Sequence, residues 1–263
     1  MDISHNTILI TGGGSGIGRA LAEAFHAEGN QVIISGRRRE MLQQTIEANP
    51  GMAAIELDIR DAADIRRVAQ QLRQSHPALN AVIHNAGIMR TENVQEPDTT
   101  DAEDIVTTNL LGPIRLTAAL LPQMLQQPAA TIMTVSSGLA FLPGAITPTY
   151  CATKAAIHSY SQSLRYQLRD TPVRVMELVP PYVQTELTGP AHASDPNAMP
   201  LKAFIDEVMA IIRATPDAHE ICVERVKPLR NAAAGGDYEA FFKRFNDARS
   251  GAAAAQWKGQ PAR

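Results

Sequence analysis

Short apolar runs alternate with longer amphipathic segments along almost the whole chain. The runs TILIT, QVIIS, AAIELDI, AVIHNAG, TIMTVSS and VRVMELV are rich in Val, Ile and Leu, and ICVERV is a candidate seventh. Continuous apolar runs of this kind are typical of strands covered on both faces, and strand–helix alternation is typical of parallel sheets. The pattern therefore predicts an α/β fold: a single-domain, doubly wound parallel sheet of about seven strands with helices on both faces, as in Rossmann folds.

The segments between these runs predict the helices. The expected helices cover roughly residues 17–29, 39–49, 61–75, 101–127, 149–169 and 201–214. Gly29 and Pro50 are expected to end the first two, and Asp61 is expected to cap the third. No linker divides the chain, so residues 1–263 are expected to form one domain, in which 236–263 make a C-terminal helix and a mobile tail.

Charge and composition exclude several classes of function. The formal net charge is only −3, so no basic field favours nucleic acid or an anionic membrane as a partner. No secretory signal is visible, and no apolar run approaches the ~18 residues of a membrane span. The two cysteines, Cys151 and Cys222, are too few for a metal cluster and are expected to be reduced thiols. We therefore expect a cytoplasmic protein without a metal.

A glycine-rich loop, TGGGSGIG, joins the first expected strand to the first helix. Glycine lets a backbone turn sharply and approach a pyrophosphate closely, and a helix N-terminus offers free N–H groups to phosphates. The alternative is a glycine-rich turn that merely packs a helix. A P-loop is excluded because no Gly-Lys-Ser/Thr follows. The residues expected to contact a dinucleotide here are Gly12, Ser15, Gly16, Ile17 and Gly18.

Arginines rather than a carboxylate follow the second expected strand, in SGRRRE. An acid at this place commonly binds the ribose 2′-hydroxyl of NAD, whereas guanidinium groups attract the 2′-phosphate of NADP. Arg37 and Arg38 therefore favour NADP(H), with NAD(H) left open. Arg39 is expected to be part of a solvated helix start.

Five motifs stand in one order along the chain: the glycine loop, HNAG at 84–87, Asn109 in TTNLLG, Ser137 in TVSSG, and YCATK at 150–154. Over roughly residues 5–187 the chain resembles the short-chain dehydrogenase/reductase family. The stretches SGRRREML, VPPYVQTEL and ICVERVKPLRNA are similar to a bacterial subgroup of DltE-like oxidoreductases.

The resemblance implies four catalytic residues. Tyr150 would be the general acid/base, and Lys154, one helical turn away on the same face, would favour its phenolate. Ser137 would hydrogen-bond the substrate oxygen, a role that suits a hydroxyl because it donates and accepts. Asn109 would hold a water behind the lysine, unless it only satisfies backbone groups at a helix kink.

The resemblance also implies further cofactor contacts. Asp58 would accept a hydrogen bond from adenine, or would be a simple turn residue, while Thr185 would bond the nicotinamide carboxamide. Lys154 would also bond the nicotinamide ribose. His84 replaces a more frequent asparagine and is expected to be structural. The full set adds Ile59, Asn85, Ala86, Gly87, Tyr150, Pro180 and Val183.

The expected substrate is a small carbonyl or alcohol compound with an apolar part. Its predicted contacts are Ser137, Leu139, Tyr150 and Tyr182, and residues 188–214 are predicted to form a lid. The alternative for 188–200 is an ordinary surface loop. His158 is expected to serve helix packing or an oligomer contact, and Cys151 to be a small core residue.

The sequence thus predicts an NADP(H)-dependent oxidoreductase that transfers hydride between a nicotinamide and a carbonyl or alcohol. A catalytically silent NADP(H)-binding sensor on the same fold is the alternative. A sugar-nucleotide epimerase would share the Tyr/Lys pair, but the chain is short and its glycine spacing differs. A serine hydrolase lacks support because no G-x-S-x-G motif is present. The resemblance further implies a homodimer or homotetramer.

Overall fold

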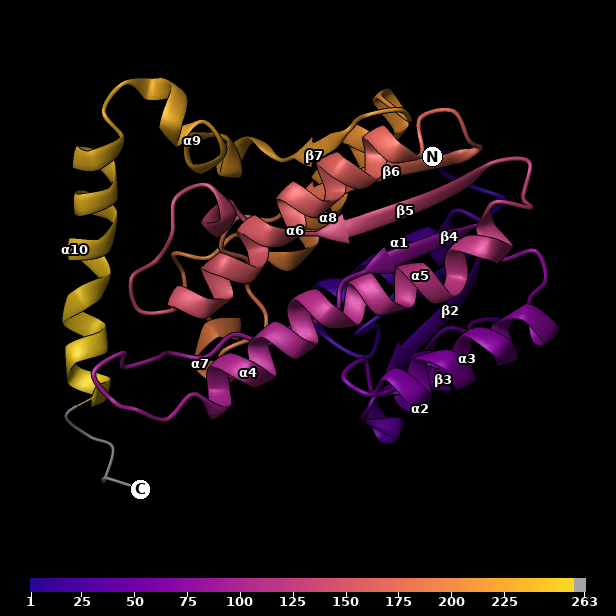
Figure 1. Cartoon of the computed structure of the whole chain (residues 1–263), viewed down its shortest axis with the longest axis horizontal. Coiled ribbons are helices and arrows are strands. Elements are labelled where there is room, and N and C mark those ends of the chain that lie inside the picture. Colours follow the sequence, from indigo (N-terminus) through magenta and orange to yellow (C-terminus); the bar gives the residue numbers. More distant parts are fainter. Residues whose placement is uncertain (258–263) are drawn as a thin grey trace.

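A seven-stranded, entirely parallel sheet forms the centre of the molecule, in the order β3-β2-β1-β4-β5-β6-β7. The computed structural model describes the backbone of residues 1–257 (Figure 1). The strands are β1 (Thr7–Thr11), β2 (Gln31–Gly36), β3 (Ala53–Glu56), β4 (Ala81–His84), β5 (Ala130–Val135), β6 (Val173–Val179) and β7 (Glu220–Cys222). The predicted fold class is confirmed.

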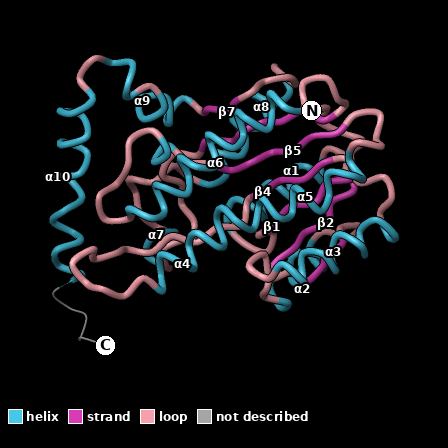
Figure 2. Tube along the Cα trace, viewed as in Figure 1, coloured by secondary structure: helices cyan, strands magenta, loops and turns pink. Residues whose placement is uncertain are grey.

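Helices lie on both faces of this sheet (Figures 1 and 2). The longer ones are α1 (Gly16–Ala27), α2 (Arg39–Ala48), α3 (Ala62–Ser75), α4 (Thr100–Val106), α5 (Gly112–Met124), α6 (Pro148–Gln167), α8 (Leu201–Ala214) and α10 (Tyr238–Trp257). Short helices α7 (Pro190–Ala193) and α9 (Lys227–Arg230), a π-turn η1 (Thr107–Leu111) and the 3₁₀ turns η2 (Gly138–Ala140), η3 (Glu224–Val226) and η4 (Ala232–Gly235) complete the order. Asp61 caps α3 as predicted, because its side chain accepts from the Ala63 N–H.

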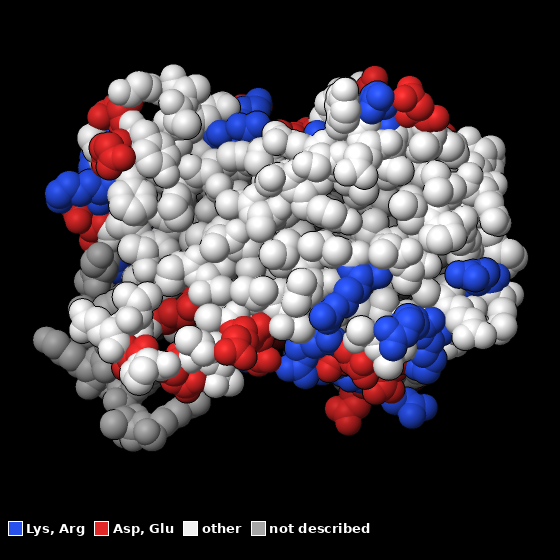
Figure 3. Space-filling view, in the orientation of Figure 1, with Lys and Arg blue, Asp and Glu red and all other residues white. Residues whose placement is uncertain are grey.

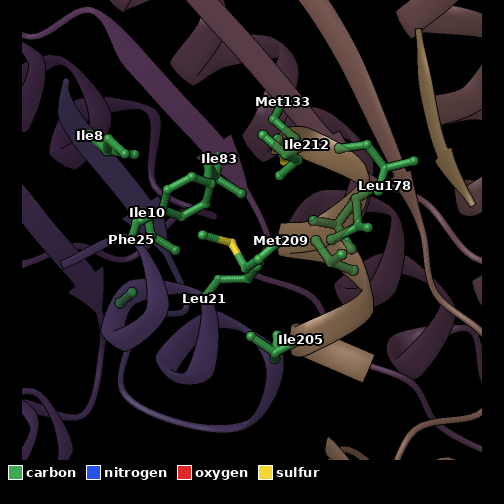
Figure 4. Close-up of a cluster of buried hydrophobic side chains, with 14 of the residues drawn as sticks. Ile8, Ile10, Leu21, Phe25, Ile83, Met133, Leu178, Ile205, Met209 and Ile212 are labelled. Atoms are coloured by element: carbon green, nitrogen blue, oxygen red, sulfur yellow. The ribbon is translucent and has the colours of Figure 1, made fainter. Parts of the chain in front are cut away.

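Alternate residues of each strand enter two different cores. In β1, Ile8 and Ile10 face one core and Leu9 faces the other. The first core joins the sheet to α1 and α8, with Phe25 of α1 and Ile205 of α8 among its buried side chains (Figure 4). Phe204 of α8 is also fully buried there. The second core joins the sheet to α3, α5 and α6. Burial on both faces explains why the strands read as continuous apolar runs.

One continuous helical stretch, Thr100–Met124, is long and apolar enough to cross a membrane by length and composition alone. Nearly half of its most apolar window, 44%, is buried inside the molecule. Leu116, Leu120 and Met124 pack into the second core. We therefore interpret this stretch as a core helix.

One predicted boundary needs correction. Residues 201–214 are not lid: they form α8, whose apolar face, including Phe204 and Val208, is buried in the first core. The expected C-terminal helix corresponds to α10, which extends from Tyr238 to Trp257. The predicted tail beyond Trp257 lies outside the described residues.

Charged side chains are unevenly distributed on the surface. They lie along the margins, where α2, α3 and α4 lie on one side and α9 and α10 on another, whereas the face over α5 and α6 carries few of them (Figure 3). Large apolar side chains are exposed on these two helices or next to them, namely Leu111, Leu125 and Tyr166.

His84, at the end of β4, is a buried structural residue as predicted. Its ring is 3% exposed, and Nε2 lies 2.9 Å from the Thr117 hydroxyl of α5. Burial lowers the pKa of His84 from 6.5 to about 4. A neutral imidazole at neutral pH suits this site, because a buried imidazolium would lack a counter-charge.

We therefore expect acid to destabilise the fold through His84. Between pH 6.5 and about 4 the unfolded histidine binds a proton and the buried one does not, so the free energy of unfolding falls as the pH is lowered through this window. The contribution should approach roughly 3 kcal/mol. Urea unfolding at a series of pH values should show a shallower slope for His84→Asn. An unchanged slope, or an equal change for the exposed His219→Asn control, would contradict this.

Candidate active site

The predicted site residues gather at the carboxyl ends of the strands, around the point where the sheet order reverses between β1 and β4. Ligands of open α/β sheets bind at such switch points. The hydroxyl of Thr11 fastens the two strands here: it donates to the Ile83 carbonyl at 3.3 Å and accepts the N–H groups of Asn85 and Ala86, each at 3.0 Å.

The glycine loop lies directly after β1 and leads into α1. Gly12 and Gly16 have φ values of +68° and +52°, which favour glycine. A Cβ on Gly18 would lie 2.3 Å from the Gly12 carbonyl oxygen, so only glycine fits there. Gly13 has the same need, because a Cβ would lie 2.6 Å from Ile34; the sequence reading did not single it out. Ile17 is partly buried against the first core.

The first turn of α1 has no side-chain cap. Ser15 occupies the N-cap position but makes no hydrogen bond to the helix. Its hydroxyl instead accepts from the Arg38 guanidinium at 2.9 Å, so Arg38 reaches from the end of β2 to the glycine loop. Arg37 and Arg39 are exposed beside it. An uncapped helix N-terminus beside guanidinium groups fits a phosphate-bearing ligand.

Asp58 follows β3 and forms hydrogen bonds within its own turn. Its carboxylate accepts from the Arg60 N–H and guanidinium, both at 3.0 Å, and this partner lowers the pKa of Asp58. Arg60 also lies 3.4 Å from Asp104 on α4. The neighbouring Ile59 is buried and approaches Gly112 so closely that a Cβ there would lie 2.6 Å from it.

Asn85 links the end of β4 to the glycine loop. Its amide donates to the Thr11 carbonyl at 3.0 Å. Ala86 follows it on the same turn, and a Cβ on Gly12 would lie 3.0 Å from its Cα. Gly87 faces the Asn109 amide, whose Oδ1 would lie 3.3 Å from an added Cβ. These residues therefore support the loop and line the same edge of the sheet.

Asn109 is 2% exposed and sits in the π-turn between α4 and α5. Its side chain pairs with the backbone of Ile88: Oδ1 accepts from the N–H at 2.8 Å, and Nδ2 donates to the carbonyl at 2.9 Å. Pro113, four residues later, has no N–H for the Asn109 carbonyl. The contacts with Ile88 fit the alternative in which Asn109 satisfies backbone groups at a helix kink, and the asparagine carbonyl is released from regular α-helical bonding at this turn.

Tyr150, Lys154 and Ser137 converge. Tyr150 and Lys154 are 7% and 5% exposed, and the ammonium lies 5.5 Å from the centre of the phenol ring. Lys154 Nζ also donates to the Val135 carbonyl at 2.8 Å. Ser137 follows β5, and its hydroxyl lies near enough to the phenol to lower the pKa of Tyr150, while its own oxygen accepts from the Leu139 N–H at 3.1 Å. The spacing of four on α6 thus places both groups beside the end of β5, as predicted.

Burial controls the acidity of the phenol. It raises the pKa of Tyr150 far above that of a free phenol, and the neighbouring Ser137 hydroxyl offsets only part of this. Burial also lowers the pKa of Lys154 to about 8, with the negative charge of Glu177 opposing the change. Desolvation disfavours the phenolate, so Tyr150 is a neutral proton donor near neutral pH.

The segment after β6 borders the glycine loop. Thr185 lies 3.5 Å from the position of a Cβ on Gly16. Pro180 accepts the Gly138 N–H at 2.9 Å, which joins this segment to the turn after Ser137. Val183 is buried and forms an isolated parallel bridge with Met199, so the chain closes back on itself around residues 184–198.

Leu139 and Tyr182 differ in their relation to the phenol. Leu139 packs against the cluster that contains Tyr150 and Cys151, together with Ile88 and Met89, which the sequence reading missed. Tyr182 is 38% exposed and points to residues 188–200 instead: its hydroxyl donates to Asp195 at 2.8 Å and its ring stacks on His192. Cys151 is a buried free thiol, and Cys222 is also free.

His158 makes a contact that the sequence did not reveal. Its Nδ1 lies 2.8 Å from the carboxylate of Glu177 on β6, which is fully buried. The histidine thus binds a carboxylate inside its own chain and also packs edge-on against the Phe141 ring, with 4.7 Å between the ring centroids. The sequence did not indicate that Glu177 is buried, because a single glutamate in the run VRVMELV resembles a solvent-facing strand residue.

The chain belongs to the short-chain dehydrogenase family, whose pattern matches residues 6–196. It is an oxidoreductase of this family, and the predicted DltE-like character is confirmed by a relative in Bacillus subtilis (strain 168), "Uncharacterized oxidoreductase DltE". That protein is 36% identical over 252 residues, which cover 94% of this chain and 98% of the relative. "Uncharacterized oxidoreductase SA2266" of Staphylococcus aureus (strain N315) is 29% identical over 73% of this chain and 84% of its own.

Solved structures share the fold. A short chain dehydrogenase from Burkholderia cenocepacia J2315 in complex with NADP has a TM-score of 0.78 and 24% identity, with 93% of this chain and 98% of that chain covered. A short chain dehydrogenase/reductase from Burkholderia phymatum in complex with NAD has the same TM-score, 20% identity, and covers 91% and 96%. Relatives in fold therefore bind either dinucleotide.

The packing of the glycine loop leads to a prediction. In Gly18→Ala the new Cβ collides with the Gly12 carbonyl and displaces the loop, so the Kd for NADPH should rise at least about tenfold. Gly235→Ala is the matched control, because no atom of the described residues lies within 4 Å of that Cβ. Titration of NADPH fluorescence measures both. Unchanged affinity in Gly18→Ala would show that the loop does not hold the dinucleotide.

Proposed function

We propose that the protein is an NADP(H)-dependent reductase of a small carbonyl compound, or a dehydrogenase of the corresponding alcohol. The observation that carries this proposal is the convergence of Ser137, Tyr150 and Lys154 in a buried setting at the switch point of the sheet. A bound nicotinamide would supply hydride to the carbonyl carbon or take it from the alcohol.

In the reducing direction the substrate oxygen gains negative charge and must receive a proton. Ser137 donates a hydrogen bond to this oxygen, and Tyr150 transfers its phenolic proton to it. The raised pKa of Tyr150 suits this order of events, because the phenol keeps its proton until the more basic alkoxide forms. The proton moves from phenol to alkoxide, and the products are an alcohol and a phenolate.

Lys154 stabilises the phenolate that remains. Its ammonium lies 5.5 Å from the ring centre and in a dry environment, where the attraction between opposite charges is strong. Because the pKa of Lys154 is about 8, the side chain is still mostly charged at pH 7. In the oxidising direction the same charge lowers the cost of removing the proton from Tyr150.

The cofactor preference rests on the end of β2. Arg37 and Arg38 are exposed there, and Arg38 reaches the hydroxyl of Ser15 in the glycine loop at 2.9 Å. A 2′-phosphate between them would replace Ser15 as the partner of Arg38 with a stronger, charge-assisted contact. The exposed arginines therefore support NADP(H) over NAD(H).

The substrate class follows from the wall beside the phenol. Leu139, Ile88 and Met89 are apolar and pack around the Tyr150 cluster. A carbonyl compound with an apolar substituent fits this wall, with its oxygen directed to Ser137 and Tyr150. We retain residues 188–200 as the predicted lid. Tyr182 contacts this segment through Asp195 and His192.

Removing one oxygen from the site tests the proton donor. Tyr150→Phe should bind NADPH within about twofold of wild type but lose at least about 100-fold in kcat, because proton transfer contributes this much. The exposed Tyr166→Phe on the same helix should keep full activity. Turnover of a ketone panel, followed at the NADPH absorbance, measures both.

Equal turnover in Tyr150→Phe and wild type would reject the assigned donor. Tight NADPH binding by the wild type without oxidation across a broad carbonyl and alcohol panel would instead support the silent sensor.

Removing the two arginines tests the cofactor preference. Arg37→Ala combined with Arg38→Ala should weaken NADPH by roughly 10- to 100-fold, because charged hydrogen bonds are lost. NADH affinity should change little, and Arg39→Ala should alter neither. Isothermal titration with both dinucleotides gives the comparison. Equal losses for NADPH and NADH would remove the argument for the 2′-phosphate.

A further inference from the structure

A buried carboxylate, that of Glu177, lies next to helix α6, which carries Tyr150 and Lys154. Glu177 on β6 is completely shielded from solvent, yet only one of its oxygens has a hydrogen-bond partner among residues 1–257. That oxygen lies 2.8 Å from Nδ1 of His158. A buried acid is costly unless positive charge or hydrogen bonds compensate it, so the identity of its compensating groups matters.

The row Tyr150, Lys154 and His158 runs along one face of α6 with a spacing of four residues. Lys154 is buried in the middle of this row and is electrostatically coupled to Glu177. His158 at the end of the row binds Glu177 directly, and its Nε2 lies 3.1 Å from the Gln162 amide. Lys154 donates to the Val135 carbonyl, and Val135 pairs in the sheet with Leu178, the residue after Glu177, so the lysine is bound beside the strand that carries the carboxylate.

Other charged groups near the carboxylate are largely paired with one another. Glu220 on β7 accepts from the Arg230 guanidinium through both oxygens, at 2.6 and 2.9 Å. Arg230 in turn covers the Phe141 ring, with its guanidinium carbon 4.3 Å from the ring centre. The ionisable groups facing Glu177 are His158 and Lys154 from α6, Glu220 and Cys222 from β7, and Arg230 from α9.

We propose that Glu177 is a positioning residue whose buried carboxylate, fixed by His158, holds Lys154 in its ammonium form beside Tyr150. The proposal rests on the proposed function, and it adds a group that touches neither substrate nor cofactor. Glu177 acts through Lys154: an adjacent negative charge favours the ammonium and opposes the desolvation that would otherwise neutralise it.

The ligand atoms of His158, Glu177 and Glu220 lie within 4.8 Å of one another, a distance that a metal ion would also require. Arg230 argues against a cation there, because it already occupies both oxygens of Glu220 and carries positive charge. A hydrogen-bonded network explains the cluster without an ion. Stoichiometric zinc or another divalent metal, found in the purified protein by elemental analysis, would overturn the proposal.

A direct titration of Lys154 tests it. The chain has only five lysines, so ¹³Cε-lysine NMR gives few signals, and Lys154→Arg assigns the buried one. In Glu177→Gln the amide can still accept from His158, but the charge is gone, so the pKa of Lys154 should fall by about 1 pH unit. Glu220→Gln, a neighbouring acid already neutralised by Arg230, is the matched control and should leave Lys154 unchanged.

Activity gives a second readout. In Glu177→Gln the kcat should fall roughly twofold at pH 7 and roughly fivefold at pH 8, because a fall of about 1 unit in the pKa of Lys154 reduces its charged share by these factors, while Glu220→Gln keeps wild-type turnover. An unchanged Lys154 titration in folded Glu177→Gln, or an equal fall in both variants, would overturn the proposal. If Glu177→Gln does not fold, the wild type decides: a Lys154 that titrates below pH 7 is not held as an ammonium. If the wild type reduces no carbonyl compound, the proposed function fails, but the NMR comparison still tests the electrostatic role of Glu177.

Discussion

The hydroxyl of Thr11 links β1 to β4, the two strands between which the strand order of the sheet reverses. It donates to β4 and accepts two N–H groups from the turn after it. The glycine loop starts at the next residue, and Asn85 spans the gap to it. The carboxyl ends of β2, β3, β5 and β6 lie along the same edge of this parallel sheet, and the segments that follow these strands carry most of the proposed cofactor contacts.

Desolvation sets the chemistry of this edge more strongly than pairwise charge. It raises the pKa of Tyr150 despite the nearby ammonium, and it lowers that of Lys154 despite a nearby carboxylate. Both shifts have the same origin, since a dry site disfavours whichever form is charged. The phenol of Tyr150 is therefore protonated and can donate its proton. The ammonium of Lys154 stabilises the phenolate only after that proton has passed to the substrate oxygen.

Features that depend on local spacing could be predicted from the sequence. Strand and helix alternation gave the fold class, and the four-residue interval between Tyr150 and Lys154 placed both beside β5. Features that depend on tertiary contact could not. Glu177 and His158 are distant in sequence, and Gly112 is required only because Ile59 packs against it. The lid was drawn too long because the apolar face of α8 can be assigned to the core only when α1 is seen beneath it.

The contact between Glu177 and His158 has a consequence for how such a chain can diverge. Loss of the imidazole would leave the buried carboxylate without its hydrogen-bond partner. Loss of the carboxylate would leave Nδ1 of the imidazole without a partner, next to a cavity. Neither replacement is neutral alone, although an apolar pair of similar volume would fill the same space. Positions 158 and 177 should therefore covary among relatives of this chain, so that a substitution in α6 is accompanied by one in β6.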